Sequence, residues 1–404
     1  MLSDHKSNYI AIGILLFINI IRQYVPIHPT IMTAVSSCLL VYVGCLFSSK
    51  LCSEEKKEGV ETMGTKDALV FPLIGSAVLF GLYLLFKFFN DKYLNVLLHI
   101  YFTLIGAYSI GQLIEEKIIE KQPFKSLSEQ QIFTIPKIPY FNPEGAKVNT
   151  LNVITFFLGL IFGGIYFVKK NWIYNNILGM AFSIFGIENL MIGQYKVGLI
   201  LLSLLFFYDI FWVFYTPVMV SVAKNIEGPV KLMFPKLKAA IEKLKAEKGD
   251  DKEYEGKAYD PREYNMIGLG DIVIPGVYVA FMLRFDLYLL NKAKKDINKN
   301  GFNLKDLKYF IATFSFYNLG ILITLCSMYF FNHAQPALLY LVPCCLLSST
   351  FTALASKEFT LLWNFNEEEL NKKDDDSSSD DEDDKKPKKK EENGENEKDK
   401  KKVE

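Results

Sequence analysis

Residues 201–220 read LLSLLFFYDIFWVFYTPVMV, an apolar run with a single carboxylate, Asp209, near its middle. The run is long enough to cross the hydrocarbon core of a bilayer, which takes about 20 apolar residues in a helix. An acidic side chain at that depth costs about 2.5–3.5 kcal/mol on insertion scales, so it indicates a functional site and requires a partner. The segment therefore predicts a membrane helix built to hold a carboxylate.

A second carboxylate follows in the next apolar segment. Residues 266–286 read MIGLGDIVIPGVYVAFMLRFD, in which Asp271 comes directly after Gly268, Leu269 and Gly270. Glycine lets backbones approach closely and tolerates unwound chain. Such a pliable edge beside a carboxylate suits a site at which an extended peptide pairs by strand addition.

The spacing of the charged residues predicts one depth for the two aspartates. The same number of residues separates Lys196 from Asp209 and Asp271 from Arg284. At a rise of 1.5 Å per residue, each separation is about 20 Å. Consecutive spanning helices run antiparallel, so we expect Lys196 and Arg284 at one face of the membrane. Asp209 and Asp271 would then face each other, as a catalyst with two carboxylates requires.

Composition narrows the function classes. Half of the 404 residues are hydrophobic, and 45 basic residues balance 45 acidic ones, which gives no indication of a nucleic-acid partner. The six cysteines contain no CxxC motif and are expected to be reduced, and the four histidines show no paired ligand spacing. We therefore expect neither a metal ion nor an organic cofactor.

Apolar segments dominate the chain and predict an all-α polytopic membrane protein with about nine spanning helices. These segments are residues 30–48, 69–89, 93–113, 150–168, 172–191, 197–223, 266–290, 307–331 and 335–356. A shorter run, residues 9–21, fits a cleaved signal, an extra span or an interfacial segment, and the sequence leaves these open. The polar loop at 114–149 contains FTIPKIPYF, which is predicted to be extended.

The pattern divides the chain into an N-terminal segment (1–29), a first membrane part (30–196), a second membrane part (197–357) and a charged tail (358–404). The second part carries both aspartates and a hydrophilic connection at 224–265. The tail contains DDDSSSDDEDD followed by KKPKKK, which cannot bury a core and is predicted to be disordered and cytosolic.

A third motif, Gln335, Pro336, Ala337 and Leu338, opens the last predicted span. The Tyr-Asp pair that begins at Tyr208, the Gly-Leu-Gly-Asp motif and this block follow one another in order, each on its own span. Together they resemble the GxGD intramembrane aspartyl proteases. The phrases GLGDIVIPG and HAQPALLYLVP are more similar to the signal peptide peptidase branch of that family than to presenilin.

The resemblance implies a presenilin-like bundle in which Asp209 and Asp271 are catalytic. It also implies that Tyr208, residues 268–270 and residues 335–338 support the active site. The implied substrates are membrane-spanning helices in type II orientation, including signal peptides left after signal peptidase cleavage. The implied surroundings are the lipid bilayer, a homo-oligomer and the degradation machinery of the endoplasmic reticulum.

The chemistry of two adjacent carboxyl groups agrees with this resemblance. Peptide hydrolysis needs activated water and a proton donor for the carbonyl, and two carboxyls that share one proton supply both. On the residues alone, two alternatives stay open. One is a proton- or ion-coupled transporter or channel that uses the aspartates as carriers, and the other is a degradation factor that holds membrane helices.

The last four residues, Lys401, Lys402, Val403 and Glu404, resemble a dilysine retrieval signal. Such a signal returns membrane proteins to the endoplasmic reticulum and is read from the cytosol. The sequence therefore predicts a multi-pass protein of the endoplasmic reticulum membrane with a cytosolic C-terminus.

Overall fold

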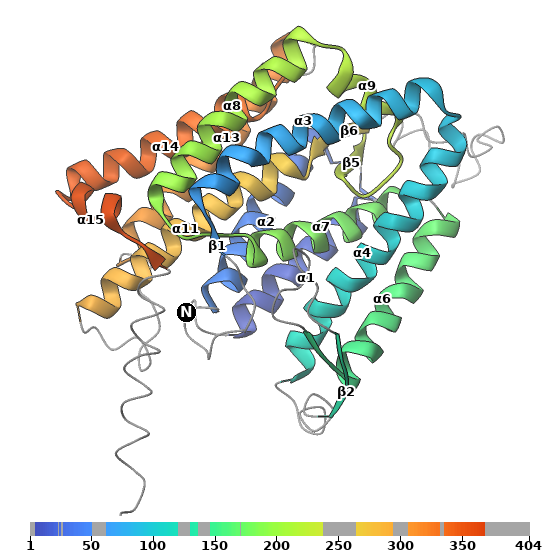
Figure 1. Ribbon diagram of the computed structural model, residues 1–404, viewed down its shortest axis with the longest axis horizontal. Coiled ribbons are helices and arrows are strands. Elements are labelled where there is room, and N and C mark those ends of the chain that lie inside the picture. Colours follow the sequence, from blue (N-terminus) through green and yellow to red (C-terminus); the bar gives the residue numbers. More distant parts are fainter. Residues whose placement is uncertain are drawn as a thin grey trace, which may run out of the picture. The chain divides into compact units, whose positions relative to one another are not determined.

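A computed structural model describes most of the chain as helices (Figure 1). The described residues are 5–22, 24–25, 27–50, 62–119, 130–135, 146–169, 171–236, 264–293, 306–331 and 335–367. The helices are α1 (His5–Ile21), α2 (Pro29–Lys50), α3 (Thr65–Phe88), α4 (Asp91–Ile119), α6 (Thr150–Lys169), α7 (Trp172–Asn189), α8 (Tyr195–Ile210), η1 (Phe211–Tyr215), α9 (Val218–Asn225), α11 (Gly270–Lys292), α13 (Lys308–Phe331), α14 (Leu338–Ala355) and α15 (Phe359–Asn364).

Short strands form three two-stranded pairs in the described part of the chain. These pairs are β1 (Thr62–Met63) with β4 (Met191–Ile192), β2 (Gln131–Ile135) with β3 (Ala146–Asn149), and β5 (Lys231–Pro235) with β6 (Tyr264–Gly268). The first pair is parallel and the other two are antiparallel. β2 includes the first residues of the FTIPKIPYF stretch, whose remaining residues lie outside the described ones.

Eight of the described helices are long and apolar enough to cross a membrane, in agreement with the predicted all-α polytopic fold. They are α2, α3, α4, α6, α8 with η1, α11, α13 and α14. The predicted span at 172–191 forms α7, an 18-residue helix that packs against α2, α4 and α11. α7 buries Asn175, Asn176 and Glu188, so its polar groups face protein rather than lipid.

The segment 197–223, predicted as one helix, is interrupted in the structure. α8 ends at Ile210, a π-helical turn follows, and Thr216 has an extended backbone before α9 begins. Pro217 accounts for the break, because proline lacks an N–H and disfavours helical geometry in the residue before it. Asp209 therefore lies in the last turn of α8 and not in the middle of a long helix.

Two later helices begin after the predicted starts. Residues 266–268 belong to β6, so the helix expected at 266–290 begins at Gly270. The span expected at 335–356 likewise forms a helix only from Leu338. Asp271 and the Pro-Ala-Leu block thus lie at helix starts, where backbone N–H groups lack helical partners, and Asp209 lies where α8 passes into the π-helical turn.

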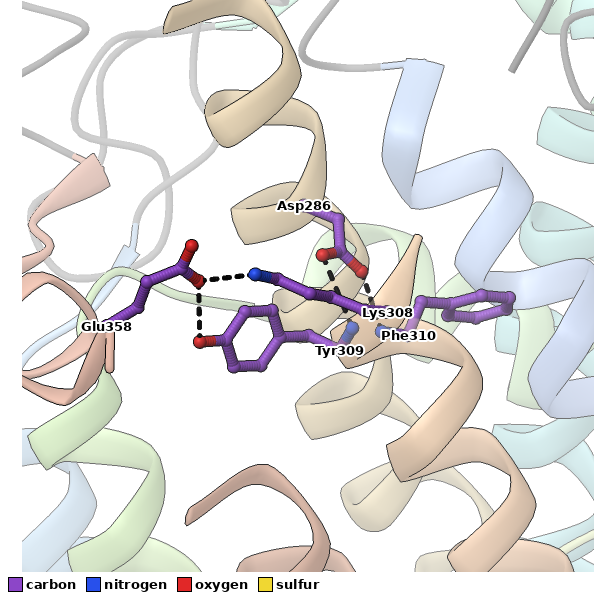
Figure 2. Close-up of polar contacts among 5 residues, drawn as sticks. All are labelled: Asp286, Lys308, Tyr309, Phe310 and Glu358. Atoms are coloured by element: carbon purple, nitrogen blue, oxygen red, sulfur yellow. Dashed lines mark hydrogen bonds and ion pairs between the residues drawn. The ribbon is translucent and has the colours of Figure 1, made fainter. Parts of the chain in front are cut away.

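A partly buried polar cluster joins α11, α13 and the connection between α14 and α15 (Figure 2). The Asp286 carboxylate accepts hydrogen bonds from the backbone N–H groups of Tyr309 (3.3 Å) and Phe310 (2.7 Å), in the first turn of α13. One oxygen of Glu358 accepts from the Tyr309 hydroxyl at 3.0 Å and pairs with the Lys308 ammonium at 2.7 Å. A carboxylate at a helix N-terminus stabilises the free N–H groups there and is itself stabilised by them. Asp286 and Glu358 therefore hold the start of α13 against α11 and against the connection between α14 and α15.

The predicted charged tail begins later than residue 358. Residues 359–364 form α15, which packs against α8 and α14. Leu362 is buried, and the Phe365 ring lies against the rings of Phe281 and Phe285. These apolar side chains can bury surface, unlike the acidic and lysine-rich residues from 368 onward, which lie outside the described residues.

Glycines allow α4 and α6 to pack closely side by side (Figure 1). A Cβ atom on Gly159 would overlap the carbonyl oxygen of Ala107, and one on Gly163 would lie 2.6 Å from Thr103 Cγ2. A Cβ atom on Gly164, the next residue of α6, would meet no atom within 4 Å. Small residues four apart are a common means of helix packing in membranes.

We predict that Gly159→Ala destabilises the bundle by about 1–3 kcal/mol, because the added methyl group separates α4 from α6. The matched control is Gly164→Ala, which adds the same methyl group to the same helix in open space. Thermal unfolding of the purified protein in detergent measures the difference. Equal melting temperatures for the two variants would contradict the close packing of α6 on α4.

Candidate active site

The two helices that carry the aspartates, α8 and α11, run antiparallel. The start of α8 lies beside Arg284, in the C-terminal half of α11. The Arg284 guanidinium donates to the Ile192 carbonyl oxygen at 3.4 Å, just before α8 begins, and to Ser48 Oγ at 2.6 Å. Arg284, which we expected at the same membrane face as Lys196, is 2% exposed and anchors α11 to α2 and to the start of α8. Asp209 and Asp271 are equally distant from Lys196 and Arg284 along their helices, so the two aspartates lie together at the end of the helix pair that is opposite to the Arg284 contact.

Asp209, in the last turn of α8, and Asp271, in the first turn of α11, lie at the same end of two helices that contact each other. Asp209 is 2% exposed, whereas Asp271 is partly exposed. Like charges that lie close together in a low-dielectric environment favour a state in which one proton is shared. This is the electrostatic arrangement that two-carboxylate hydrolysis uses.

The Pro-Ala-Leu block touches Asp209 through its backbone. The Leu338 N–H donates to Asp209 Oδ2 at 3.1 Å, and Leu338 is the first residue of α14. N–H groups in the first turn of a helix have no helical acceptor and favour negative charge. Pro336 and Ala337 are buried and begin this turn, while Gln335 accepts a 3.5 Å hydrogen bond from the Tyr340 hydroxyl. The sequence pattern predicted support from this block but could not identify the amide donor.

The glycines before Asp271 differ in their surroundings. A Cβ on Gly268 would lie 3.3 Å from Asp271 Oδ2, whereas one on Gly270 would meet nothing within 4 Å. Leu269 donates its N–H to the Val230 carbonyl at 3.0 Å, which extends the β5–β6 pairing up to the start of α11. Gly268 thus keeps the space beside the carboxylate free of a side chain.

Two asparagines of α7, which the sequence pattern did not single out, hold the other edge of β5. The Asn176 amide donates to the Met233 carbonyl and accepts from the Met233 N–H, both at 2.8 Å. Asn175 donates to the Lys231 carbonyl at 2.9 Å. Asn176 therefore pairs with β5 as a neighbouring strand would. The sequence signal that could have identified Asn175 and Asn176 is the presence of polar residues within a short apolar segment.

Tyr208 lies toward α3, which runs beside α8 (Figure 1). Its ring is near Gly75 of α3 and 6.3 Å from the Trp212 ring, and Trp212 donates to Ser76 Oγ at 3.2 Å. Among the described residues, the Tyr208 hydroxyl has no hydrogen-bond partner. These contacts favour a packing role for Tyr208 over a hydrogen bond across the site.

The described residues include no group of three or more His, Cys, Asp or Glu side chains that could hold a metal ion. The Leu338 amide contacts Asp209, and Gly268 at the end of β6 lies beside Asp271. The site thus presents two carboxyl groups in a helical membrane bundle, which defines a polytopic membrane protein with a two-aspartate centre.

Comparison with known proteins identifies the family. A family model described as signal peptide peptidase matches residues 55–369, and the chain belongs to this family. It is 37% identical to the signal peptide peptidase of Homo sapiens over 337 residues, which cover 81% of each chain. It is also 31% identical over 341 residues to a probable intramembrane protease of Schizosaccharomyces pombe, covering 84% of this chain and 94% of that one.

Membership establishes the chemistry in outline. The protein is an intramembrane aspartyl protease, a hydrolase that acts on transmembrane substrates within the membrane. Its apolar helices make it a multi-pass membrane protein. Of the three function classes considered from the sequence, the family therefore supports the protease over a transporter or a holding factor.

We predict that Tyr208→Phe changes the cleavage rate by less than about threefold, because it removes a hydroxyl without a described partner. Tyr208→Ala should lower the rate by about tenfold, because it empties the space between α8 and α3. Initial rates on a transmembrane reporter peptide measure both effects. A large loss in Tyr208→Phe would instead support a hydrogen bond from this hydroxyl during catalysis.

Proposed function

We propose that Asp209 and Asp271 form the catalytic dyad of this protease. The observation that carries the proposal is that Asp209, in the last turn of α8, and Asp271, in the first turn of α11, lie at the same end of two antiparallel helices that contact each other. One carboxylate takes a proton from a water molecule, and the protonated partner donates a hydrogen bond to the substrate carbonyl oxygen. The water oxygen bonds to the carbonyl carbon, and the carboxyl group that took the proton then gives it to the amide nitrogen, so that the C–N bond breaks and the amine leaves. The shared proton belongs to the pair and is not assigned to one residue.

The surrounding residues support this chemistry by position. The Leu338 N–H orients Asp209 through Oδ2 and leaves its other oxygen for water or substrate. Gly268 and Gly270 leave room beside Asp271 for a peptide backbone. A substrate helix must unwind before its peptide bond is accessible, and within the described chain β6 pairs only with β5. The unwound substrate therefore adds to β6 as a strand and passes directly beside Asp271.

The substrates that we propose are transmembrane helices in type II orientation, including signal peptides that remain after signal peptidase cleavage. Two curated relatives that cover most of this chain are named signal peptide peptidase, which supports this class. We also propose residence in the endoplasmic reticulum membrane with a cytosolic C-terminus, on the basis of Lys401 and Lys402, which lie outside the described residues. Homo-oligomers and the degradation machinery of that compartment are the proposed partners.

We predict that Asp209→Asn and Asp271→Asn each lower the cleavage of a reporter signal sequence by about a thousandfold or more, because each removes half of an acid–base pair. Purified protein in detergent is assayed, with photocrosslinking to show that the variants still bind the reporter. Asp67→Asn is the matched control, because Asp67 is an exposed carboxylate that accepts from the Gly64 N–H at the start of α3.

Full cleavage by either variant would contradict the dyad. The transporter alternative would be favoured if the wild type cleaves nothing but carries proton or ion flux, and the two variants lose that flux. Unchanged substrate disposal in both variants would favour the holding factor.

A further inference from the structure

Helix α1 and the residue after it, Arg22, lie next to the residues that hold β5, the strand paired with β6 beside the candidate active site. Its apolar run was open to three interpretations, one of which was a cleaved signal. α1 packs against α2 and α7, and Leu15 is 1% exposed. Two polar side chains at its C-terminal end, Asn19 and Arg22, are each 1% exposed. Buried polar groups are costly unless they are hydrogen-bonded, so their partners indicate what they do.

Asn19 completes the hydrogen bonding of Asn176. Its Oδ1 accepts from Asn176 Nδ2 at 3.2 Å, and its own Nδ2 donates to the Leu15 carbonyl at 2.8 Å. An amide nitrogen has two N–H donors, and those of Asn176 bind Met233 of β5 and Asn19. Because Asn176 also accepts from the Met233 N–H, its side chain is fixed in the one orientation that matches β5.

Arg22 holds the other end of β5. Its Nη2 donates to the carbonyl of Pro235, the last residue of β5, at 2.8 Å, and its Nη1 donates to the Val25 carbonyl at 3.4 Å. Both acceptors are backbone carbonyls, so the guanidinium acts as a donor that fixes backbone positions. Removal of α1 together with Arg22 would leave the partly buried Pro235 carbonyl and one N–H of the buried Asn176 without these partners.

The contact extends through the strand register to the catalytic residue. Pro235 pairs with Tyr264, Met233 with Met266, and Lys231 with Gly268. Gly268 lies against the Asp271 carboxylate, as the 3.3 Å separation between Asp271 Oδ2 and a Cβ at this position indicates. A shift of β5 along its own axis would therefore move β6, the strand to which we assign the substrate.

We infer that α1 is retained in the mature protein and that Asn19 and Arg22 are positioning residues, which hold β5 and, through it, the substrate-pairing strand β6. The kinetic part of this inference rests on the proposed function. Neither residue touches the reacting atoms, so their loss affects how substrate is held more than the chemical step. KM and the choice of scissile bond are therefore the sensitive readouts.

Intact-mass analysis of the full-length protein, purified from a eukaryotic membrane, tests retention. We expect a mature chain that still contains residues 5–22. A mature N-terminus beyond residue 22 would overturn the inference, whatever the activity of the protein.

Kinetics on the reporter peptide test the positioning role. Asn19→Ala and Arg22→Ala are expected to raise KM by about threefold to tenfold each, with kcat within about twofold, since each removes hydrogen bonds that fix β5. Product mass spectra should show cleavage spread over neighbouring bonds. Arg22→Lys, which keeps a donor, should restore much of the wild-type KM and product pattern. Ile20→Ala is the matched control, because Ile20 is exposed on the same helix.

Two outcomes would overturn the positioning role. One is an unchanged KM and product pattern in both alanine variants. The other is a lower kcat, a higher KM and weaker binding of a transition-state-mimicking inhibitor, all to a similar degree and not rescued by Arg22→Lys. That result would indicate a general folding defect. Asp271→Asn is assayed in parallel, because retained cleavage in that variant would refute the proposed dyad. The retention of α1 is then judged from the intact mass alone.

Discussion

The hydrogen bond from the Leu338 N–H to Asp209 is the contact on which the arrangement of the site depends. A carboxylate inside a membrane bundle needs donors, and a helix that begins inside the bundle has backbone N–H groups that need acceptors. Each group satisfies the requirement of the other. The bond joins α8 to α14, while the nearby charge of Asp271 brings in α11, so three helices from distant parts of the chain meet at one point.

Helix ends, rather than helix centres, build this site. α8 loses its regular geometry after Ile210, α11 begins only after β6, and α14 begins only after Pro336. Irregular backbone at membrane depth is tolerated where protein surrounds it or where it lines a cavity. Such backbone supplies amides, a strand edge and space beside the carboxylates, and a protease that must unwind a helical substrate needs all three. The rest of the bundle keeps these helix ends in place, through contacts such as those of Asp286 and Arg284.

The sequence predicted the class of fold, because apolar run length follows directly from bilayer thickness, and the charge spacing led us to expect the aspartates at one depth. It predicted helix ends less well. Pro217 signalled the break after Tyr215 but was assigned to a continuous span, and Gly268 was placed in a helix although it ends a strand. The sequence did not reveal the hydrogen bond between Arg284 and Ser48, because charge alone does not identify a buried partner. The roles of Asn176, Asn19 and Arg22 depend on contacts between residues far apart in the chain, which no local pattern encodes.

The central claim is that Asp209 and Asp271 act on one substrate bond as a pair. The most direct measurement is an experimental structure of the wild-type protein bound to a peptide inhibitor whose hydroxyl mimics the tetrahedral intermediate. The account predicts that this hydroxyl lies within hydrogen-bonding distance of both carboxyl groups, with the inhibitor backbone paired to β6. A hydroxyl in contact with only one aspartate, or with neither, would contradict it.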